Sequence, residues 1–335
     1  MPGLCSAHRD TTGLIRLEDP HHAMTLGVAP RAGNMAFSLT VHGHEILRFP
    51  FESIDDFLAR GGGWQGIPFL APWANRLDET AFYANGRRFA FDLELGNVRG
   101  PIPIHGLIAN DPGWRVIDIG STADASWVTS RLDFFADPLL MKQFPFAHTI
   151  DMTYRLGGGV LEVETRLSNM AAEPMPVSIG FHPYLKLTDS TRDEWRVAIG
   201  ARAEWVLDDR KIPTGVTRPI ERLLPNPSST SLRDVDLDHV FGDLIRDAEG
   251  RSLMTVRGRA QRIDVVAGPL YDASVVYAPA RPPAGQDRDF ICFEPMAAIT
   301  NAMNLAHRGQ YAGLQSIPPA GTWTERFWVR PTGFV

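Results

Sequence analysis

The feature that most constrains the fold is a strict alternation of apolar and polar residues between positions 149 and 167. In the first run the apolar positions are Ile150, Met152, Tyr154 and Leu156, and in the second they are Leu161, Val163 and Leu167, with Thr165 on the same face. A repeat of two residues is typical of a β-strand with one buried face. Three glycines at 157–159 separate the runs, so we predict a β-hairpin.

Shorter runs of β-forming residues recur along the chain, each bounded by turn residues. They lie at 36–41, 127–134, 262–266, 274–277 and 326–329. Helical patterns are rare, and a brief helix is expected at 53–59, where Ser53 caps the first turn and Gly61 follows the end. Because the 30 glycines and 26 prolines are scattered and mark no linker, we predict one all-β sandwich domain spanning residues 1–335.

Composition excludes several classes of protein. With 44% hydrophobic and 21% charged residues the chain is globular, and its net charge of -6 provides no broad positive field for nucleic acid and mildly disfavours anionic substrates. No secretory signal is expected at the N-terminus and no apolar stretch approaches a membrane span. Only Cys5 and Cys292 occur, too few for a disulfide framework. We predict a cytoplasmic protein without membrane or nucleic-acid partners; oligomeric state is left open.

The apolar segment FICFEP at 290–295 contains one acid, Glu294. By alternation Phe290, Cys292 and Glu294 share one face of a strand, so the carboxyl lies above apolar residues. Burial there raises a carboxyl pKa and makes it a proton acceptor near neutrality. A glutamate exposed at the end of a strand is the alternative.

A second isolated titratable group, His182, lies within the apolar segment SIGFHPYLKL at 178–187. Its ordinary pKa near 6.5 suits a positioned acid. The alternative is a core histidine whose ring is satisfied by a backbone carbonyl.

Three further segments carry candidate ligand-binding residues. The glycine-rich stretch 61–79 holds two tryptophans, of which Trp73 is predicted to stack on a sugar ring, and Asn75 and Arg76 to bind its hydroxyl groups. The alternatives are a core tryptophan and an ion pair of Arg76 with Asp78 or Glu79. In PIPIHGLI at 101–108, His105 precedes a glycine that lets a ligand approach the backbone, and in LDHVF at 237–241, Asp238 can accept hydrogen bonds.

Metal and nucleotide sites are disfavoured by the same segments. His42 and His44 are separated by a glycine that indicates a turn, and no third ligand follows at a recognisable spacing. The glycines at 61–66 match no phosphate-binding loop, because no helical pattern begins after them.

The motifs PWANRL, IHG, GFHPYL, IPTG, LDHVF and FEP occur in an order and at intervals that together resemble the aldose 1-epimerase (galactose mutarotase) family over nearly the whole chain. The resemblance implies a large antiparallel β-supersandwich that interconverts the α and β anomers of a free aldohexose without metal or cofactor. It assigns Glu294 as general base at the anomeric hydroxyl and His182 as general acid at the ring oxygen. Arg76, His105 and Asp238 match substrate-binding positions. PFLAPWANR departs from the GRYANR-type sequence, so the preferred sugar does not transfer.

Three rival functions stay open. A hexose-6-phosphate 1-epimerase on the same scaffold needs extra cations at the cleft, for which Arg60, Arg87, Arg88 and Arg99 are available. A non-catalytic carbohydrate-binding protein would keep the pocket alone. A glycosidase would use Glu294 with Asp238 as its carboxyl pair.

Overall fold

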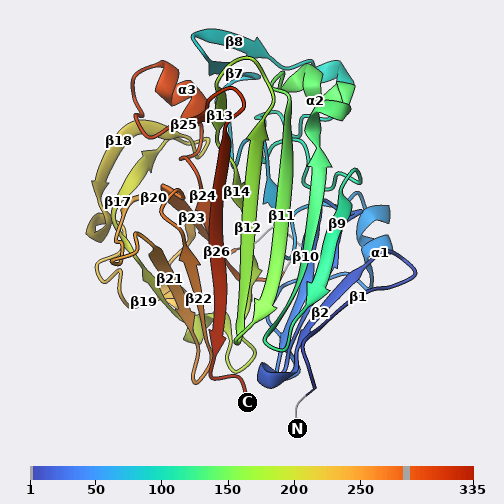
Figure 1. Cartoon of the computed structure of the whole chain (residues 1–335). Coiled ribbons are helices and arrows are strands. Elements are labelled where there is room, and N and C mark those ends of the chain that lie inside the picture. Colours follow the sequence, from blue (N-terminus) through green and yellow to red (C-terminus); the bar gives the residue numbers. More distant parts are fainter. Residues whose placement is uncertain (1–2, 282–286) are drawn as a thin grey trace.

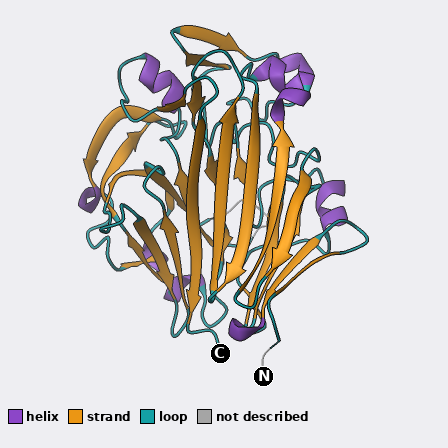
Figure 2. Ribbon diagram, in the orientation of Figure 1, coloured by secondary structure: helices purple, strands orange, loops and turns teal. Residues whose placement is uncertain are grey.

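Antiparallel sheets dominate the computed structural model, which describes residues 3–281 and 287–335 (Figures 1 and 2). The nine-stranded sheet contains, in spatial order, β19 (Thr230–Ser231), β16 (Arg196–Ile199), β21 (Ser252–Arg257), β22 (Arg262–Ala267), β26 (Thr322–Thr332), β12 (Val160–Asn169), β11 (His148–Gly157), β10 (Ala125–Asp133) and β9 (Arg115–Ser121). Figure 1 looks onto the long central strands of this sheet.

A second large sheet carries the strands that matter most for the candidate site. Its order is β18 (Pro213–Pro219), β17 (Ala201–Leu207), β20 (Leu237–Leu244), β23 (Ala273–Ala278), β24 (Ile291–Met296), β14 (Gly180–Phe181) and β6 (Phe69–Leu70), and β15 (Tyr184–Leu185) pairs with β24. The short strands β14 and β15 flank His182, so both sides of this residue are anchored to the sheet.

Smaller elements complete the described chain. A five-stranded sheet contains β1 (Ser6–Arg9), β2 (Ile15–Asp19), β3 (Met24–Ala29), β4 (Met35–Val41) and β5 (His44–Glu45), and two-stranded sheets pair β13 (Met175–Val177) with β25 (Gln315–Ile317) and β7 (Ala81–Ala84) with β8 (Arg87–Ala90). The α-helices are α1 (Ile54–Ala59), α2 (Pro138–Gln143) and α3 (Ala302–His307). The 3-10 helices are η1 (Pro20–His22), η2 (Leu93–Leu95), η3 (Phe134–Ala136), η4 (Arg192–Glu194), η5 (Ile220–Arg222) and η6 (Leu232–Asp234).

The predicted hairpin is confirmed as β11 and β12. Gly157 pairs with Val160, which leaves Gly158 and Gly159 as a two-residue loop with φ of +62° and +75°. Two consecutive residues with positive φ are the geometry of a type I′ turn, which glycine adopts without steric cost. The apolar positions of both strands are buried, as the alternation indicated.

The other predicted elements are also confirmed, with small shifts at their ends. The runs at 36–41, 262–266, 274–277 and 326–329 lie in β4, β22, β23 and β26. The run at 127–134 lies in β10, which ends at Asp133 because η3 begins with Phe134. Helix α1 starts after Ser53, whose side chain accepts a hydrogen bond from the Asp56 backbone N–H at 3.1 Å.

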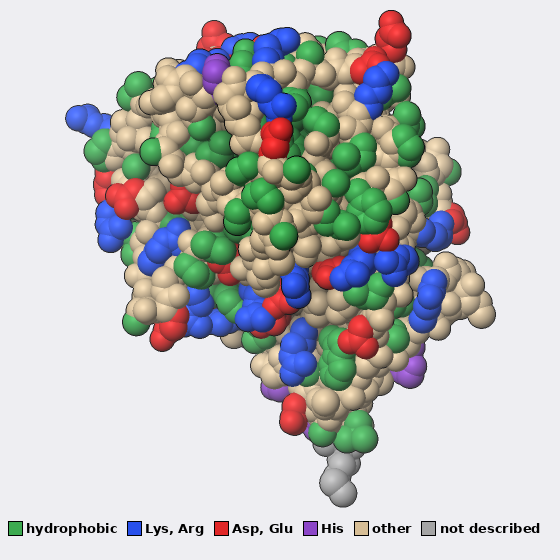
Figure 3. Space-filling model, turned by 45° about the horizontal axis from the view of Figure 1, so that its top comes forward, with side chains coloured by type: hydrophobic (Ala, Val, Ile, Leu, Met, Phe, Trp, Pro, Cys, Tyr) green, Lys and Arg blue, Asp and Glu red, His purple; other side chains and the backbone are tan. Residues whose placement is uncertain are grey.

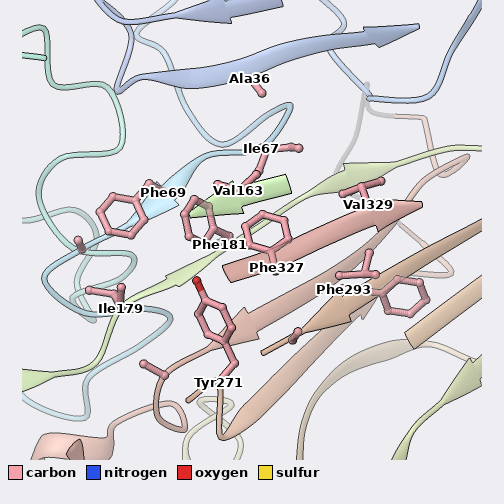
Figure 4. Packing of buried hydrophobic residues seen from close by; sticks show 14 of the residues in the cluster. Ala36, Ile67, Phe69, Val163, Ile179, Phe181, Tyr271, Phe293, Phe327 and Val329 are labelled. Carbon is pink, nitrogen blue, oxygen red and sulfur yellow. The ribbon is translucent and has the colours of Figure 1, made fainter. Parts of the chain in front are cut away.

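Aromatic packing in the main core determines which face of β24 is free for the site. Phe181 of β14 lies 4.9 Å from Phe69 and 4.8 Å from Phe327 of β26, measured between ring centroids. Figure 4 shows Phe293 of β24 in the same cluster, which also contains the fully buried Ile291. Because side chains alternate along a strand, Cys292 and Glu294 point to the opposite face of the sheet.

The surface carries charges of both signs. Figure 3 shows basic and acidic side chains interspersed over the face that it presents. No helix in the described part of the chain is long and apolar enough to span a membrane.

Candidate active site

A cavity of ≈ 220 Å³ lies on the face of β20, β23 and β24 that points away from the main core. Its walls are Trp64, Asn75, Arg76, Ile104, His105, His182, Tyr184, Asp238, Tyr277 and Glu294. Three larger hollows, of ≈ 490, ≈ 460 and ≈ 270 Å³, have no buried ionisable side chain among their lining residues. The smaller cavity is therefore the candidate active site.

Glu294 and His182 form a contact inside this cavity. His182 Nε2 lies 3.2 Å from Glu294 Oε1, and the two side chains are 6% and 1% exposed. Glu294 Oε2 and His182 Nδ1 are buried without a hydrogen-bond partner among the described residues. The sequence left open whether Glu294 is exposed and whether His182 is satisfied by a carbonyl, and the structure places the two groups against each other.

The shared environment of this pair sets its protonation. Burial, with a contribution from the charge of Asp238, raises the pKa of Glu294 well above its usual range. Burial, with a smaller effect from Arg76, lowers the pKa of His182. Both shifts favour the neutral forms, so in the resting state the carboxyl of Glu294 is protonated and the imidazole of His182 is uncharged.

The His182 ring is held on two sides. It stacks on Tyr184, with ring centroids 4.5 Å apart and planes at 9°, and meets His105 edge-on at 5.3 Å. Its backbone N–H donates to the Pro68 carbonyl at 3.1 Å. These contacts fix where a proton on the imidazole can be delivered.

The Asn75 backbone contacts both the backbone and the ring of His105, and the contact with the ring determines the tautomer of His105. Both have left-handed backbones, with φ of +58° and +59°. The His105 N–H donates to the Asn75 carbonyl at 3.0 Å, and the Asn75 N–H donates to His105 Nδ1 at 3.2 Å. Since Nδ1 accepts, and burial keeps the pKa of His105 well below its ordinary value, the neutral ring carries its hydrogen on Nε2. That N–H is a donor within the cavity wall.

Arg76 is oriented by its neighbours in the cavity. The Asn75 side-chain oxygen accepts from the Arg76 backbone N–H at 2.9 Å and from its Nη1 at 3.0 Å. Its Nη2 lies 3.5 Å from Oδ2 of Asp238, which belongs to strand β20. The alternative partners are engaged elsewhere, because Asp78 pairs with Arg308 and Glu79 with Arg88.

Trp73 corrects one prediction from the sequence. It is fully buried in the main core, where it stacks on Phe91 at 4.9 Å, so it does not face the cavity. The tryptophan of the same segment that lines the cavity is Trp64, which meets the His105 ring edge-on at 4.6 Å. The sequence singled out the wrong tryptophan of the two for stacking.

Gly106 is a second correction. Its φ is +69°, and a Cβ built there would lie 2.0 Å from the Ala71 carbonyl oxygen. The group that approaches this glycine is therefore the Ala71 backbone and not a ligand, and the Leu107 N–H donates to the same oxygen at 2.8 Å. The close approach joins the segment carrying Arg76 to the segment carrying His105.

Tyr277 and Tyr184 are cavity residues that the sequence did not identify. Tyr277 lies opposite Asp238 on β20 and opposite Cys292 on β24, which places all three on one face of the sheet. The sequence offered one indication of Tyr277, because the run 274–277 was predicted to be a strand and Tyr277 is its one polar aromatic residue. Cys292 shares the face of Glu294, as predicted, but is fully buried in a cluster with both tyrosines and Phe290 rather than on the cavity wall.

The four arginines considered as extra cations differ in their contacts. Arg60, Arg87 and Arg88 pair with Asp56, Glu173 and Glu79, respectively. Arg99 instead lies with its guanidinium carbon 5.4 Å from the centroid of the Trp64 ring. Only this one of the four contacts a residue that lines the cavity.

Within residues 3–281 and 287–335, no group of three or more His, Cys, Asp and Glu side chains is placed to hold a metal ion. His42 and Gly43 form the expected turn between β4 and β5, with φ of +48° and +81°.

Comparison with known proteins gives a consistent result. The family model described as aldose 1-epimerase matches residues 16–324. Over 236 residues, 70% of each chain, the sequence is 26% identical to the uncharacterized protein YihR of Escherichia coli (strain K12). A galactose mutarotase-like protein from Clostridium acetobutylicum is similar in structure, with a TM-score of 0.83, 21% identity and 99% of both chains covered. For galactose 1-epimerase from Lactobacillus acidophilus NCFM the TM-score is 0.75 at 14% identity, covering 98% of this chain and 99% of that one. These structures share the fold.

Proposed function

The chain belongs to the aldose 1-epimerase family, and from this premise we propose that it interconverts the α and β anomers of a free aldohexose by opening and reclosing the sugar ring. The observation that carries the proposal is the 3.2 Å contact between His182 Nε2 and Glu294 Oε1 in a monosaccharide-sized cavity. Ring opening removes a proton from the anomeric hydroxyl and delivers one to the ring oxygen. Because C1 bears both oxygens, the base and the acid must be close neighbours.

The pair supplies both proton transfers without changing its total charge. Moving the shared proton from the Glu294 carboxyl to His182 creates a carboxylate base beside an imidazolium acid. Glu294 then takes the hydroxyl proton while His182 protonates the ring oxygen, and the C1–O5 bond breaks to give an aldehyde. Rotation about C1–C2 and reclosure, with the two groups in reversed roles, produces the other anomer. Each positioned group contributes about a hundred- to ten-thousand-fold.

The remaining polar side chains are suited to hold the sugar. Arg76, with its guanidinium fixed by Asn75 and Asp238, is a donor toward the ring oxygen and nearby hydroxyl groups. His105 presents its Nε2–H, and Asp238 accepts from a hydroxyl group. Trp64 offers an aromatic wall for the apolar face of the ring.

The cavity volume favours this reaction over glycoside hydrolysis. A glycosidase must hold the rings on both sides of the bond that it cleaves, whereas ≈ 220 Å³ accommodates about one hexose. A purely carbohydrate-binding protein would have no use for a buried pair of titratable groups that share one proton.

Polarimetry on freshly dissolved α-glucose and α-galactose tests the proposal. The wild type should accelerate mutarotation, and Glu294→Gln and His182→Asn should each lower kcat by about a hundredfold or more. Matched controls are Glu325→Gln and His148→Asn, which change a buried glutamate and a buried histidine outside the cavity and should keep wild-type activity. Full activity in Glu294→Gln would overturn the assignment of the base.

A further inference from the structure

Arg99 is a half-buried cation beside the cavity, in contact with its lining residue Trp64, and it lacks an anionic partner. Among residues 3–281 and 287–335, no ion pair includes it, and the remaining residues, Met1, Pro2 and 282–286, contain no acidic side chain. Burial lowers the pKa of Arg99, and no carboxylate charge opposes this effect. Desolvating a guanidinium without a counter-ion costs free energy, which a bound anion would offset.

Contacts lead from Arg99 to the acid–base pair. Its guanidinium lies over Trp64, Trp64 meets His105, and His105 meets His182 at a ring-centroid distance of 5.3 Å. The charge of Arg99 also contributes to the lowered pKa of His105, so the two side chains are electrostatically close. Arg99 is thus part of the surroundings of the cavity and not a distant surface residue.

The position of Arg99 is fixed by the loop that carries Trp64. With its amide oriented so that both atoms are paired, the Asn110 oxygen accepts from Arg99 Nη2 at 2.5 Å and from the Gly63 N–H at 3.2 Å. The Asn110 nitrogen donates to the Gly63 carbonyl at 3.2 Å. Asn110 therefore holds the guanidinium beside Trp64 while leaving the rest of its fork unpaired in the described structure.

The charges in the cavity and immediately beside it do not cancel. Arg76 and Asp238 balance each other, and burial keeps Glu294, His182 and His105 neutral. What is left is the positive charge of Arg99. The overall charge of -6 disfavours anions at long range. Salt screens charges that lie more than about 8–10 Å from the cavity, so the nearby charge of Arg99 has the larger effect on an anion bound there.

We infer that Arg99 is a specificity-determining residue that binds an anionic substituent of the sugar, on the part of the molecule that extends toward Trp64. The inference deepens the proposed function and rests on it for the location of the anomeric carbon at Glu294 and His182. A planar guanidinium pairs well with a carboxylate, phosphate or sulfate group. The substrate class is an acidic aldose with a free anomeric hydroxyl group.

The test measures binding and anomer exchange separately for glucose, glucose 6-phosphate, glucose 6-sulfate and glucuronate. Binding by titration calorimetry uses the Glu294→Gln protein, so that it does not depend on catalysis. At least one acidic sugar should bind at least about tenfold more tightly than glucose. Comparison of the three acidic sugars shows whether the site prefers a phosphate, a sulfate or a carboxylate group. Arg99→Gln should weaken that sugar by about tenfold to a hundredfold and change glucose binding less than about twofold.

Arg60→Gln is the matched control, because Arg60 also lies over an aromatic ring, Phe51 at 5.8 Å, but outside the cavity. This variant should bind every sugar as its parent does. Equal weakening of neutral and acidic sugars by Arg99→Gln, or no preference for any acidic sugar, overturns the inference. If acidic sugars bind through Arg99 but no sugar shows accelerated anomer exchange, the proposed function fails and the assignment of the anion site holds.

Discussion

The buried histidine His148 allows a stability prediction with a worked magnitude. Its Nδ1 lies 2.7 Å from the Phe146 carbonyl oxygen and its ring stacks on Phe134 at 4.2 Å. Burial lowers its pKa to about 4, against the opposing effect of the hydrogen bond to the Phe146 carbonyl. In the unfolded chain the pKa is about 6.5, so as the pH falls below this value the unfolded state becomes protonated at His148 while the folded state stays largely neutral.

The sign follows from linkage. Because the folded pKa is depressed for a group that is charged when protonated, folding stability decreases as the pH falls from about 6.5 to about 4. At pH 4 the protonation of this one residue in the unfolded state should lower the free energy of unfolding by roughly 3 kcal/mol relative to neutral pH. His148→Asn removes the titrating group but keeps a nitrogen donor near the position of Nδ1.

Urea unfolding of both proteins at about pH 7 and pH 4 measures the effect. The wild type should lose roughly 3 kcal/mol more than His148→Asn over this interval, with similar m-values. Equal losses in wild type and His148→Asn would refute the reasoning that burial keeps this ring neutral.

Three further predictions concern the cavity. Trp64→Ala should raise KM about tenfold with little loss of stability, whereas Trp73→Ala should reduce the free energy of unfolding by about 3–5 kcal/mol, as measured by sugar kinetics and urea titration. Gly106→Ala should destabilise more than Gly86→Ala, because both glycines have positive φ but only Gly106 has a backbone atom where the Cβ would lie; equal costs of about 1–2 kcal/mol would contradict this. Because burial lowers the pKa of His182 and raises that of Glu294, kcat/KM should not fall between about pH 7 and pH 5, where an exposed histidine would become protonated; a fall centred near 6.5 would contradict the shared-proton assignment.

The sequence predicted the parts of the fold that carry a strong local pattern. The β11–β12 hairpin has ten-residue strands with one face buried, so its alternation is plain. The strands β14 and β15 have two residues each, both buried, and no periodicity can appear over that length. They are strands because they pair with β6 and β24, which lie far from them in the sequence. The single-domain assignment stays a prediction.

Within the site, single titratable residues in apolar segments were more informative than aromatic ones. Glu294 and His182 each had to be explained because an isolated charge is costly in a strand core. Tryptophans are common both in cores and in pockets, so the segment 61–79 did not distinguish Trp64 from Trp73. What distinguishes the two tryptophans is the stacking of Trp73 on Phe91, a contact that only the folded chain shows.

Anomer exchange at equilibrium tests the central claim most directly. In a solution of an aldose at its final anomer ratio, the wild-type protein should produce exchange cross-peaks between the α and β H1 signals in NMR, without changing their ratio. Glu294→Gln should produce none above the uncatalysed level, and a disaccharide should keep its glycosidic bond. Bound sugar without accelerated exchange, across neutral and acidic aldoses alike, would contradict the account and indicate a protein that binds sugars without acting on them.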